Sequence, residues 1–258
     1  MSWLERDGVR LAYEVHGEDG PGQAALLTHG YGASRRMWDL NLPALAPHGP
    51  TVAWDMRGHG ESDAPDDPSL YSHELTLDDM EAVLDAVGAP TAVLVGMSLG
   101  GFLSLALNLR RPERVAGLVL VDTGPGFRSE VARERWNAWA RDRADRLEAD
   151  GIDALPAGTE QRQAGHTHGA QGLAHAARGI LVQQDAAVFE SLTQIAVPTL
   201  VVVGSEDAQF LAAADVMEER IPGARKVVLP RAGHAANMDA PEEFNSAVGE
   251  FLATVERP

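Results

Sequence analysis

The chain of 258 residues contains no cysteine. That absence excludes disulfide bonds, thiolate metal sites and a thiol nucleophile. Lysine is nearly absent as well, because Lys226 is the only one, so chemistry that depends on a lysine amine is almost removed from consideration. Serine is therefore the nucleophile to look for.

Long apolar runs are also missing. No segment approaches the roughly 18 apolar residues that a membrane-spanning helix needs. The first residues carry Glu5, Arg6 and Asp7, where a secretory signal would need an apolar stretch. The hydrophobic fraction of 45% and the charged fraction of 23% are those of an ordinary globular protein. We expect a cytoplasmic protein with no membrane partner.

Positive charge is scarce relative to negative charge. The formal net charge is −17 and the isoelectric point is near 4.8. A field of this sign repels phosphate, so nucleic acid and anionic lipid are not expected partners.

The length suits one large α/β domain with an insertion. The sequence leaves the oligomeric state open.

Short apolar runs bounded by Gly, Pro or Asp alternate with segments of helical period. This alternation is typical of a mainly parallel sheet covered by helices on both faces. A helix is predicted from Thr76, as its N-cap, to Gly88, and another from Pro241 to Val255. The predicted strands, the first of which follows a hairpin turn at Asp7 and Gly8, are 9–15, 24–28, 51–54, 91–95, 115–121, 197–203 and 226–229.

The alternation breaks over 126–192, where charged helical sequence and turns replace strands. We predict that this stretch is a helical cap inserted into a core formed by 1–125 and 193–258. Its clearest helix is expected from about Ser129 to Ala149.

Two pairs of side chains in the predicted cap are candidates for binding substrate. Trp136 and Trp139 fall on one helix face, and they either line a pocket at the mouth of the sheet or only anchor the cap to the core. His166 and His168 are separated by one residue, and they either line the pocket or are solvated. No Asp, Glu or third His nearby completes a convincing ligand set with the histidine pair, so we predict no metal site.

The most informative motif surrounds Ser98, between the predicted strand 91–95 and a helix-like run over 102–109. Gly96 and Gly100 lie two residues before and two after the serine. Glycines at this spacing fit a nucleophile elbow, a strand-to-helix turn too tight for neighbouring β-carbons. The turn places the hydroxyl beside the helix N-terminus, whose free amides can stabilise an oxyanion.

A serine nucleophile needs a general base, usually a histidine oriented by a carboxylate. His234 lies in a Gly- and Ala-rich loop after the last predicted strand, and Asp207 directly follows the strand 197–203. Loops at the carboxyl ends of parallel strands gather in one place. We therefore predict a catalytic triad of Ser98, Asp207 and His234. Asp122, at the end of the strand before, is a rival for the acid, and Glu206 is a weaker one.

These motifs resemble those of the α/β-hydrolase family over nearly the whole chain, and the order Ser, Asp, His is that family's. The resemblance implies a mostly parallel eight-stranded sheet flanked by helices, with a helical cap insertion. The run from His29 to Gly32 matches the family's HGxG loop. This match implies that the backbone N–H groups of Tyr31 and Leu99 form the oxyanion hole. The run 55–62 resembles the DxRGxGxS loop, which is structural in the family.

The resemblance implies a serine hydrolase that cleaves a small carboxylic ester through an acyl-enzyme, without a metal or organic cofactor. Ser98 excludes the Asp nucleophile of haloalkane dehalogenases and epoxide hydrolases. Ala235 stands where plant-type hydroxynitrile lyases carry Lys, and Met97 where carbon–carbon bond hydrolases usually carry Asn, which counts against the latter without excluding them. Enol-lactone-type lactonases, thioesterases and cofactor-free perhydrolases stay open, as does a receptor with no turnover.

Overall fold

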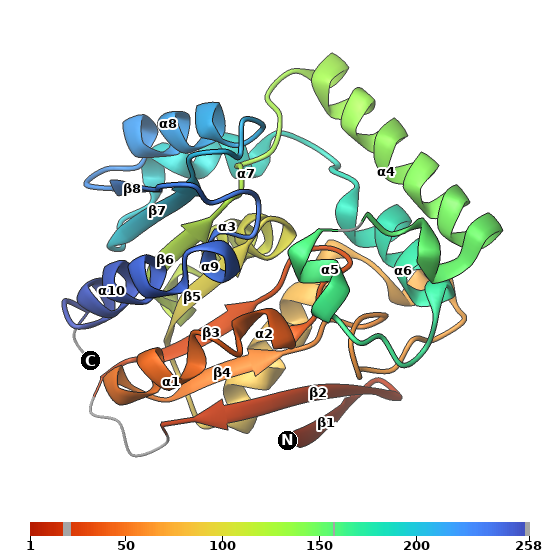
Figure 1. Ribbon diagram of the computed structural model, residues 1–258, viewed down its shortest axis with the longest axis horizontal. Helices are drawn as coiled ribbons and strands as arrows, with labels where there is room; N and C mark the ends of the chain where they lie inside the picture. Colours follow the sequence, from red (N-terminus) through yellow and green to blue (C-terminus); the bar gives the residue numbers. More distant parts are fainter. Residues whose placement is uncertain (18–21, 157, 256–258) are drawn as a thin grey trace.

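An eight-stranded sheet forms the centre of the computed structural model, which describes residues 1–17, 22–156 and 158–255 (Figure 1). The strand order is β1-β2-β4-β3-β5-β6-β7-β8. The β1/β2 and β2/β4 pairs are antiparallel and the other pairs are parallel, so the predicted mostly parallel sheet is confirmed. The strands are β1 (Ser2–Arg6), β2 (Val9–His16), β3 (Ala24–Thr28), β4 (Thr51–Trp54), β5 (Ala92–Met97), β6 (Val115–Val121), β7 (Thr199–Gly204) and β8 (Arg225–Leu229).

The predicted strands agree with these to within two residues at each end. Asp7 and Gly8 both have positive φ angles, 53° and 76°, and they form the predicted hairpin turn between β1 and β2. Strand β7 begins at Thr199, later than predicted, and Pro198 just before it has no N–H to donate to the ladder.

Successive residues of the central strands face two separate apolar layers. Leu118 and Leu120 of β6 belong to one buried cluster, and Val119 and Val121 to the other, as the two-residue period of a strand requires. The helices are α1 (Leu42–Leu45), α2 (His73–Ala86), α3 (Leu99–Arg110), α4 (Glu130–Asp150), α5 (Thr159–Gln163), α6 (Ala170–Ala176), α7 (Ala187–Ser191), α8 (Leu211–Arg220), α9 (Ala236–Asp239) and α10 (Pro241–Leu252).

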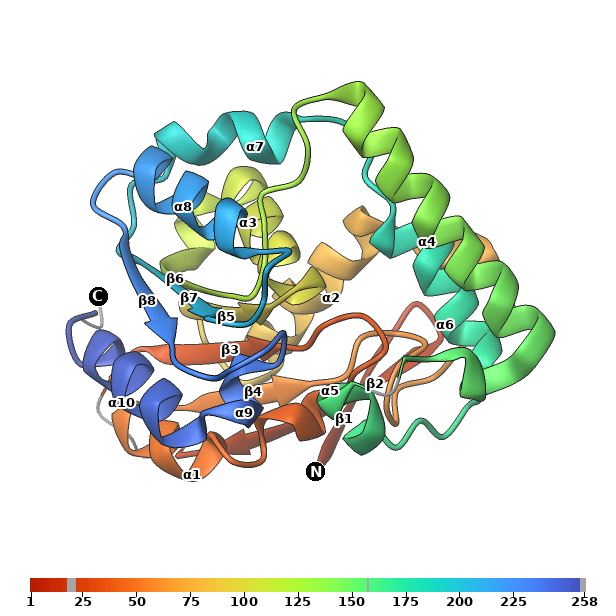
Figure 2. The ribbon, with the colours of Figure 1, turned by 45° about the horizontal axis from the view of Figure 1, so that its top comes forward.

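Helices cover both faces of the sheet. Buried residues of α2, α3 and α8 share a cluster with Leu118 and Leu120, whereas those of α1, α9 and α10 share the cluster of Val119 and Val121. Figures 1 and 2 show α10 and α1 lying together, away from α8 and α3. The sheet is thus the middle layer of three, and its hydrophobic strands are buried on both sides.

The start of α2 differs from the prediction. The helix begins at His73, and its N-cap is Ser72, whose hydroxyl accepts a hydrogen bond from the Leu75 N–H. Thr76 lies inside the first turn, where its hydroxyl donates to the Ser72 carbonyl oxygen at 2.8 Å. The predicted N-cap at Thr76 is therefore wrong by one turn. Ser72 and Thr76 are both residue types that cap helices well. Ser72 caps this helix because its hydroxyl accepts the Leu75 N–H, one turn before the amides that Thr76 could reach. The predicted stop before Gly88 is confirmed.

The chain between β6 and β7 carries α4 to α7, and its described residues form no strand. Ser129 caps α4, which ends at Asp150 before Gly151 with φ 73°, close to the predicted limits. Figure 1 shows α4 and α6 together, apart from α8 and α10. The division into a cap over 126–192 and a core stays a prediction, and residues 18–21, 157 and 256–258 of those ranges lie outside the described part.

The run 55–62 has the structural role that its resemblance implied. Arg57 and Asp79 are both fully buried and form a two-pronged ion pair, with both N···O distances at 2.7 Å. The Ser62 hydroxyl donates to the Asp55 carbonyl oxygen, and the Asp55 carboxylate pairs with Arg35. These contacts tie the loop to α2 and to the segment that follows β3, beside the carboxyl edge of the sheet.

Among the helices that the structure describes, none is long and apolar enough to cross a bilayer. Even α4, with 21 residues, is rich in Arg and Glu.

Candidate active site

Ser98 lies in the turn between β5 and α3, at the carboxyl edge of the sheet. Its φ angle is 51° and its ψ angle −114°, a conformation that a residue with a side chain rarely adopts and that costs on the order of 1–3 kcal/mol. The turn is held by the Ser98 N–H, which donates to the Val121 carbonyl oxygen, and by the Thr123 hydroxyl, which donates to the Ser98 carbonyl oxygen. These bonds tie the elbow to the end of β6.

The two glycines of the elbow are required by close backbone contacts. A β-carbon on Gly96 would lie 2.3 Å from the Gly100 carbonyl oxygen, and one on Gly100 would lie 2.2 Å from the Thr28 carbonyl oxygen. Helix α3 therefore starts almost in contact with β5 and β3. This is the crowding that the spacing of the glycines predicted.

His234 joins Ser98 to Asp207. Its Nε2 lies 3.1 Å from the Ser98 Oγ, and its Nδ1 lies 2.8 Å from an Asp207 carboxylate oxygen. Asp207 follows β7 and is buried, with a side chain 6% exposed. The three residues predicted from separate loops thus form one hydrogen-bonded chain.

Asp122, the rival acid, is fully buried and engaged elsewhere. One carboxylate oxygen accepts the Gly204 N–H at 2.8 Å, and the other accepts the Ala236 N–H at 3.0 Å. Burial raises the pKa of Asp122 to about 7, against the lowering effect of these two bonds. Asp122 therefore links the end of β7 to the loop of His234, while Asp207 holds the imidazole itself.

The electrostatics around His234 suit a general base oriented by a carboxylate. Burial lowers the pKa of His234, but the hydrogen bond and the charge of Asp207 outweigh it, so the pKa is raised above its usual value. The imidazole stacks on Phe210 with ring centroids 5.0 Å apart. This stacking and the Asp207 bond leave little freedom for the ring to turn away from Ser98.

The two predicted oxyanion-hole residues flank the elbow. Leu99 is the first residue of α3, so its N–H is one of the amides that a helix start leaves unpaired. Tyr31 follows β3, and its phenol donates to the Leu173 carbonyl oxygen. Neither backbone N–H has a hydrogen-bond acceptor among the described residues. Both amides are therefore available to an oxygen bound near Ser98.

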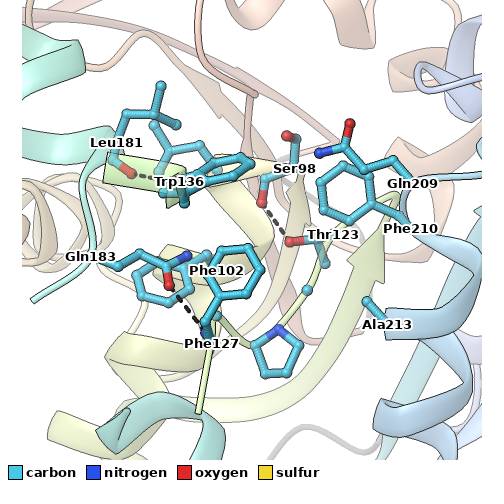
Figure 3. Close-up of a pocket in the computed structure, with 14 residues that line it drawn as sticks. Ser98, Phe102, Thr123, Phe127, Trp136, Leu181, Gln183, Gln209, Phe210 and Ala213 are labelled. Atoms are coloured by element: carbon cyan, nitrogen blue, oxygen red, sulfur yellow. Dashed lines mark hydrogen bonds between the residues drawn. The ribbon is translucent and has the colours of Figure 1, made fainter. Parts of the chain in front are cut away.

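Two cavities meet at Ser98. The first, which we call the apolar chamber, has a volume of about 140 Å³ and is shown in Figure 3. Gln183 and Thr123 also reach this chamber, and the Gln183 carboxamide oxygen accepts the Phe127 N–H. Its walls are mainly aromatic and aliphatic side chains: Phe102, Phe127, Trp136, Leu181, Phe210 and Ala213.

The second cavity, which we call the polar chamber for the charged residues in its lining, has a volume of about 210 Å³ and also reaches Ser98. Besides Ser98, it is lined by His234 and by residues of both the sheet edge and the 126–192 segment. The lining residues include Tyr31, Trp139, Arg143, Glu160 and Gln161. Gln209, Phe210, Trp136 and Leu181 are common to both chambers and mark the boundary between them.

The structure places the two candidate tryptophans at these chambers. Trp136 lines both, and its indole N–H donates to the Leu181 carbonyl oxygen at 2.8 Å. Trp139 lines the polar chamber and packs on Trp136 with ring centroids 4.7 Å apart. Trp136 thus reaches the pocket, while its indole hydrogen bond joins two parts of the predicted cap and does not anchor the cap to the core.

The two candidate histidines do not reach either chamber. The His166 Nδ1 accepts the Gly60 N–H, and its Nε2 donates to the Gly32 carbonyl oxygen. Both ring nitrogens are therefore used in linking two loops, and His168 is exposed. We do not carry these residues forward as substrate ligands. Nor does the described part of the chain gather three or more His, Asp or Glu side chains that could hold a metal ion.

Several chamber residues were not identified from the sequence. Arg143 lies four residues after Trp139 and seven after Trp136, so helical spacing already put the three on one face of α4. Phe210 lies three residues after Asp207, in the same loop. No local sequence pattern indicates that Gln183 and Leu181 line a chamber. They lie near Ser98 only because of the path that the chain takes after α6.

Comparisons with known proteins agree with this arrangement. A family model described as "Alpha/beta hydrolase family" matches residues 25–247. The chain is 30% identical, over 96% of its length and 97% of the relative, to a protein of Bacillus subtilis (strain 168) provisionally named a 2-succinyl-6-hydroxy-2,4-cyclohexadiene-1-carboxylate synthase. It is 27% identical, over 97% and 96%, to 3-oxoadipate enol-lactonase 1 of Acinetobacter baylyi (strain ATCC 33305 / BD413 / ADP1).

The fold is also that of a solved esterase. A thermophilic esterase from Thermogutta terrifontis superposes with a TM-score of 0.83 at 29% identity, covering 100% of both chains. The family match spans most of the sequence and includes the elbow, the acid loop and the histidine loop. The eight-stranded sheet, the turn at Ser98 and these similarities lead to one conclusion: the chain belongs to the α/β-hydrolase family, and it is a hydrolase.

Proposed function

We propose that this protein is a serine hydrolase that cleaves a small carboxylic ester through an acyl-enzyme on Ser98. The observation that carries the proposal is the hydrogen-bonded chain from the Ser98 Oγ through His234 to Asp207, with distances of 3.1 and 2.8 Å. A hydroxyl is a weak nucleophile at its own pKa, and an adjacent imidazole held by a carboxylate activates it.

In the first half of the reaction, the Ser98 Oγ attacks the ester carbonyl carbon while the His234 Nε2 takes the hydroxyl proton. The carbonyl oxygen becomes an oxyanion, which the amides of Tyr31 and Leu99 stabilise. The bond from the carbonyl carbon to the alcohol oxygen then breaks, and His234 returns its proton to that oxygen. The products are the free alcohol and Ser98 carrying the acyl group.

In the second half, water attacks the acyl carbon and gives its proton to His234. The bond to the Ser98 Oγ breaks, the Oγ regains a proton from His234, and the carboxylic acid leaves. Asp207 stays ionised throughout and keeps the Nδ1 proton directed toward itself. Every bond and proton is accounted for by these residues, the ester and one water.

We further propose that the acyl group is short or carries a single ring. The support is the apolar chamber, whose volume of about 140 Å³ is close to that of a cavity that binds benzene. On a panel of p-nitrophenyl esters, kcat/KM is expected to favour acyl chains of two to about six carbons. A preference for long-chain esters would contradict this.

Lactone hydrolysis is the second candidate, because it uses the same residues on an internal ester. The specific support is the similarity to an enol-lactonase over 97% of the chain.

We also expect the reaction to take place in the cytoplasm.

The test is covalent labelling with a fluorophosphonate probe. The wild type is expected to take up one probe per chain, and Ser98→Ala is expected to take up none. Ser205→Ala, at an exposed serine of the acid loop, is the matched control and should label like the wild type. An unlabelled wild type that hydrolyses no ester would refute the proposal and favour a receptor without turnover.

A further inference from the structure

The two chambers differ in which catalytic group they expose. His234 lines the polar chamber, and the walls of the apolar chamber do not include it. If His234 protonates the departing alcohol oxygen, that oxygen must lie on the polar side of Ser98. The acyl group then occupies the apolar chamber. The residues of the polar chamber contact the leaving alcohol, so their chemistry indicates what kind of alcohol it is.

The polar chamber contains an arginine without an ionic partner. Arg143, on α4, is half-buried, and among the described residues no carboxylate lies within 4.0 Å of its guanidinium. Its plane packs against the Trp139 ring, with 4.6 Å from the guanidinium carbon to the ring centroid, and lies 5.8 Å from that of Tyr31. The two rings hold the group in place, and no hydrogen bond joins its N–H groups to the part of the chain that the structure describes.

Two neighbouring arginines, unlike Arg143, have carboxylate partners. Arg146, one turn further along α4, pairs with Asp142 at 2.9 Å. Arg178, packed against the same helix, binds both Asp145 and Glu148. In a chain with a net charge of −17, carboxylates for arginines are plentiful. A half-buried cation with no anion nearby is partly desolvated without compensation, and a ligand could supply the anion.

The charge of Glu160 acts on Arg143 from beyond ion-pair distance. Glu160 lines the same chamber, yet no ion pair joins the two within the described residues. Both Glu160 carboxylate oxygens instead lie against Gly158, in the turn before α5. Glu160 therefore faces its own segment of chain, and the donors of Arg143 stay open to the chamber.

We propose that the polar chamber binds the alcohol half of the substrate and that Arg143 binds a carboxylate on it, which makes the substrate an ester or lactone with an anionic leaving side. The inference rests on the proposed function, because His234 must act on the leaving oxygen. A carboxylate accepts two parallel N–H groups from a guanidinium, and Arg has the geometry for this pairing.

The test compares two acetate esters of similar size, neutral propyl acetate and anionic 3-acetoxypropanoate. For the wild type, kcat/KM is expected to be about tenfold to hundredfold higher on the anionic ester, the effect of hydrogen bonds to a charged group. Arg143→Gln is expected to bring the ratio of the two rates near unity, and Arg143→Lys to leave an intermediate ratio. Arg146→Gln removes an exposed charge from the same helix and should keep the wild-type ratio.

Equal wild-type rates on the two esters, or a ratio that Arg143→Gln leaves unchanged, would overturn the assignment. A preference for the cationic ester acetylcholine that is lost in Glu160→Gln would assign the chamber to Glu160 instead. Calorimetric binding of 3-hydroxypropanoate, expected to weaken at least about tenfold in Arg143→Gln, needs no turnover. If Ser98 does not label and no ester is cleaved, the proposed function fails, while this binding experiment still decides the role of Arg143.

Discussion

The arrangement around Ser98 depends on a few side chains whose positions are fixed by others. The strained backbone of Ser98 is held by hydrogen bonds to Val121 and Thr123, and His234 is held between Asp207 and Phe210. Ordering these groups in advance reduces the cost of aligning them during reaction. Among these residues the triad acid is the most informative to replace, because the sequence offered both Asp207 and Asp122 as candidates for it.

Replacing Asp207 by Asn is expected to lower kcat by about 10⁴-fold, because the amide no longer holds His234 in the tautomer that accepts the Ser98 proton. Asp207 also raises the pKa of His234. Since the base acts unprotonated, the acid limb of kcat/KM should move to lower pH in Asp207→Asn. Steady-state kinetics over pH 5–9 measure both effects.

Asp122→Asn is the comparison variant. It replaces a carboxylate that accepts two backbone N–H groups, so we expect mainly a loss of stability, about 1–3 kcal/mol by urea unfolding. If a folded Asp122→Asn lost turnover while Asp207→Asn kept it, the two acids would have to exchange roles.

Among the elements, the junction of β5 with α3 leaves no room for an added β-carbon. Gly100→Ala would place a β-carbon 2.2 Å from the Thr28 backbone oxygen, and backbone cannot move aside as a flexible side chain does. We expect a loss of about 2 kcal/mol or more in the free energy of unfolding, with lower activity because the helix start shifts.

Gly117→Ala is the matched control for the junction. Gly117 lies in the neighbouring strand β6, and its added β-carbon would meet Phe251 at 3.4 Å, an ordinary contact. Urea unfolding of both variants measures the difference. Equal stabilities would show that the junction tolerates an extra carbon.

Element boundaries show where local signals suffice. The apolar period predicts the strands, and the turn residues predict the hairpin at Asp7. The cap at Ser129 predicts where α4 begins. The start of α2 could not be decided locally, because Ser72 and Thr76 are both good caps. His73 is fixed in the helix by a hydrogen bond between its Nε2 and the carbonyl oxygen of Ile180, more than a hundred residues away.

At the scale of the whole molecule, the chain buries a cluster of neutral histidines behind the oxyanion loop. His59 lies between His29 and His166, with ring centroids 5.0 and 6.0 Å away. Burial lowers the pKa of His29 to about 4, and it lowers those of His59 and His166 as well. Three imidazoles from β3, the 55–62 loop and the segment before α6 thus share one packed site.

This cluster predicts a loss of stability in mild acid. The unfolded chain takes up these protons below about pH 6.5, whereas folded His29 does so only near pH 4, so stability falls as the pH drops through that window. His29 alone contributes a loss of about 2 kcal/mol between pH 7.5 and 5. Asp122, whose pKa burial raises to about 7, has the opposite sign and offsets about as much as His29 loses, so the net loss comes from His59 and His166. Urea unfolding at both pH values measures the sum.

His59→Phe keeps a ring in the cluster and removes one titrating group, including an Nε2 that lacks a hydrogen-bond partner in the described structure. Its stability should therefore depend less steeply on pH than that of the wild type. A His59→Phe variant whose stability depends on pH as steeply as that of the wild type would show that the cluster does not control acid unfolding.

Local spacing, and the rule that parallel strands end together, are enough to predict the parallel sheet, the elbow at Ser98 and the loops that carry Asp207 and His234. Only the tertiary structure decided that Asp207, and not Asp122, contacts His234, since both carboxylates end neighbouring strands. The fold also makes His166 a link between two loops and places Arg143 at a chamber where it forms no ion pair with a described residue. The physical reason is that pairing and burial depend on contacts between residues distant in sequence.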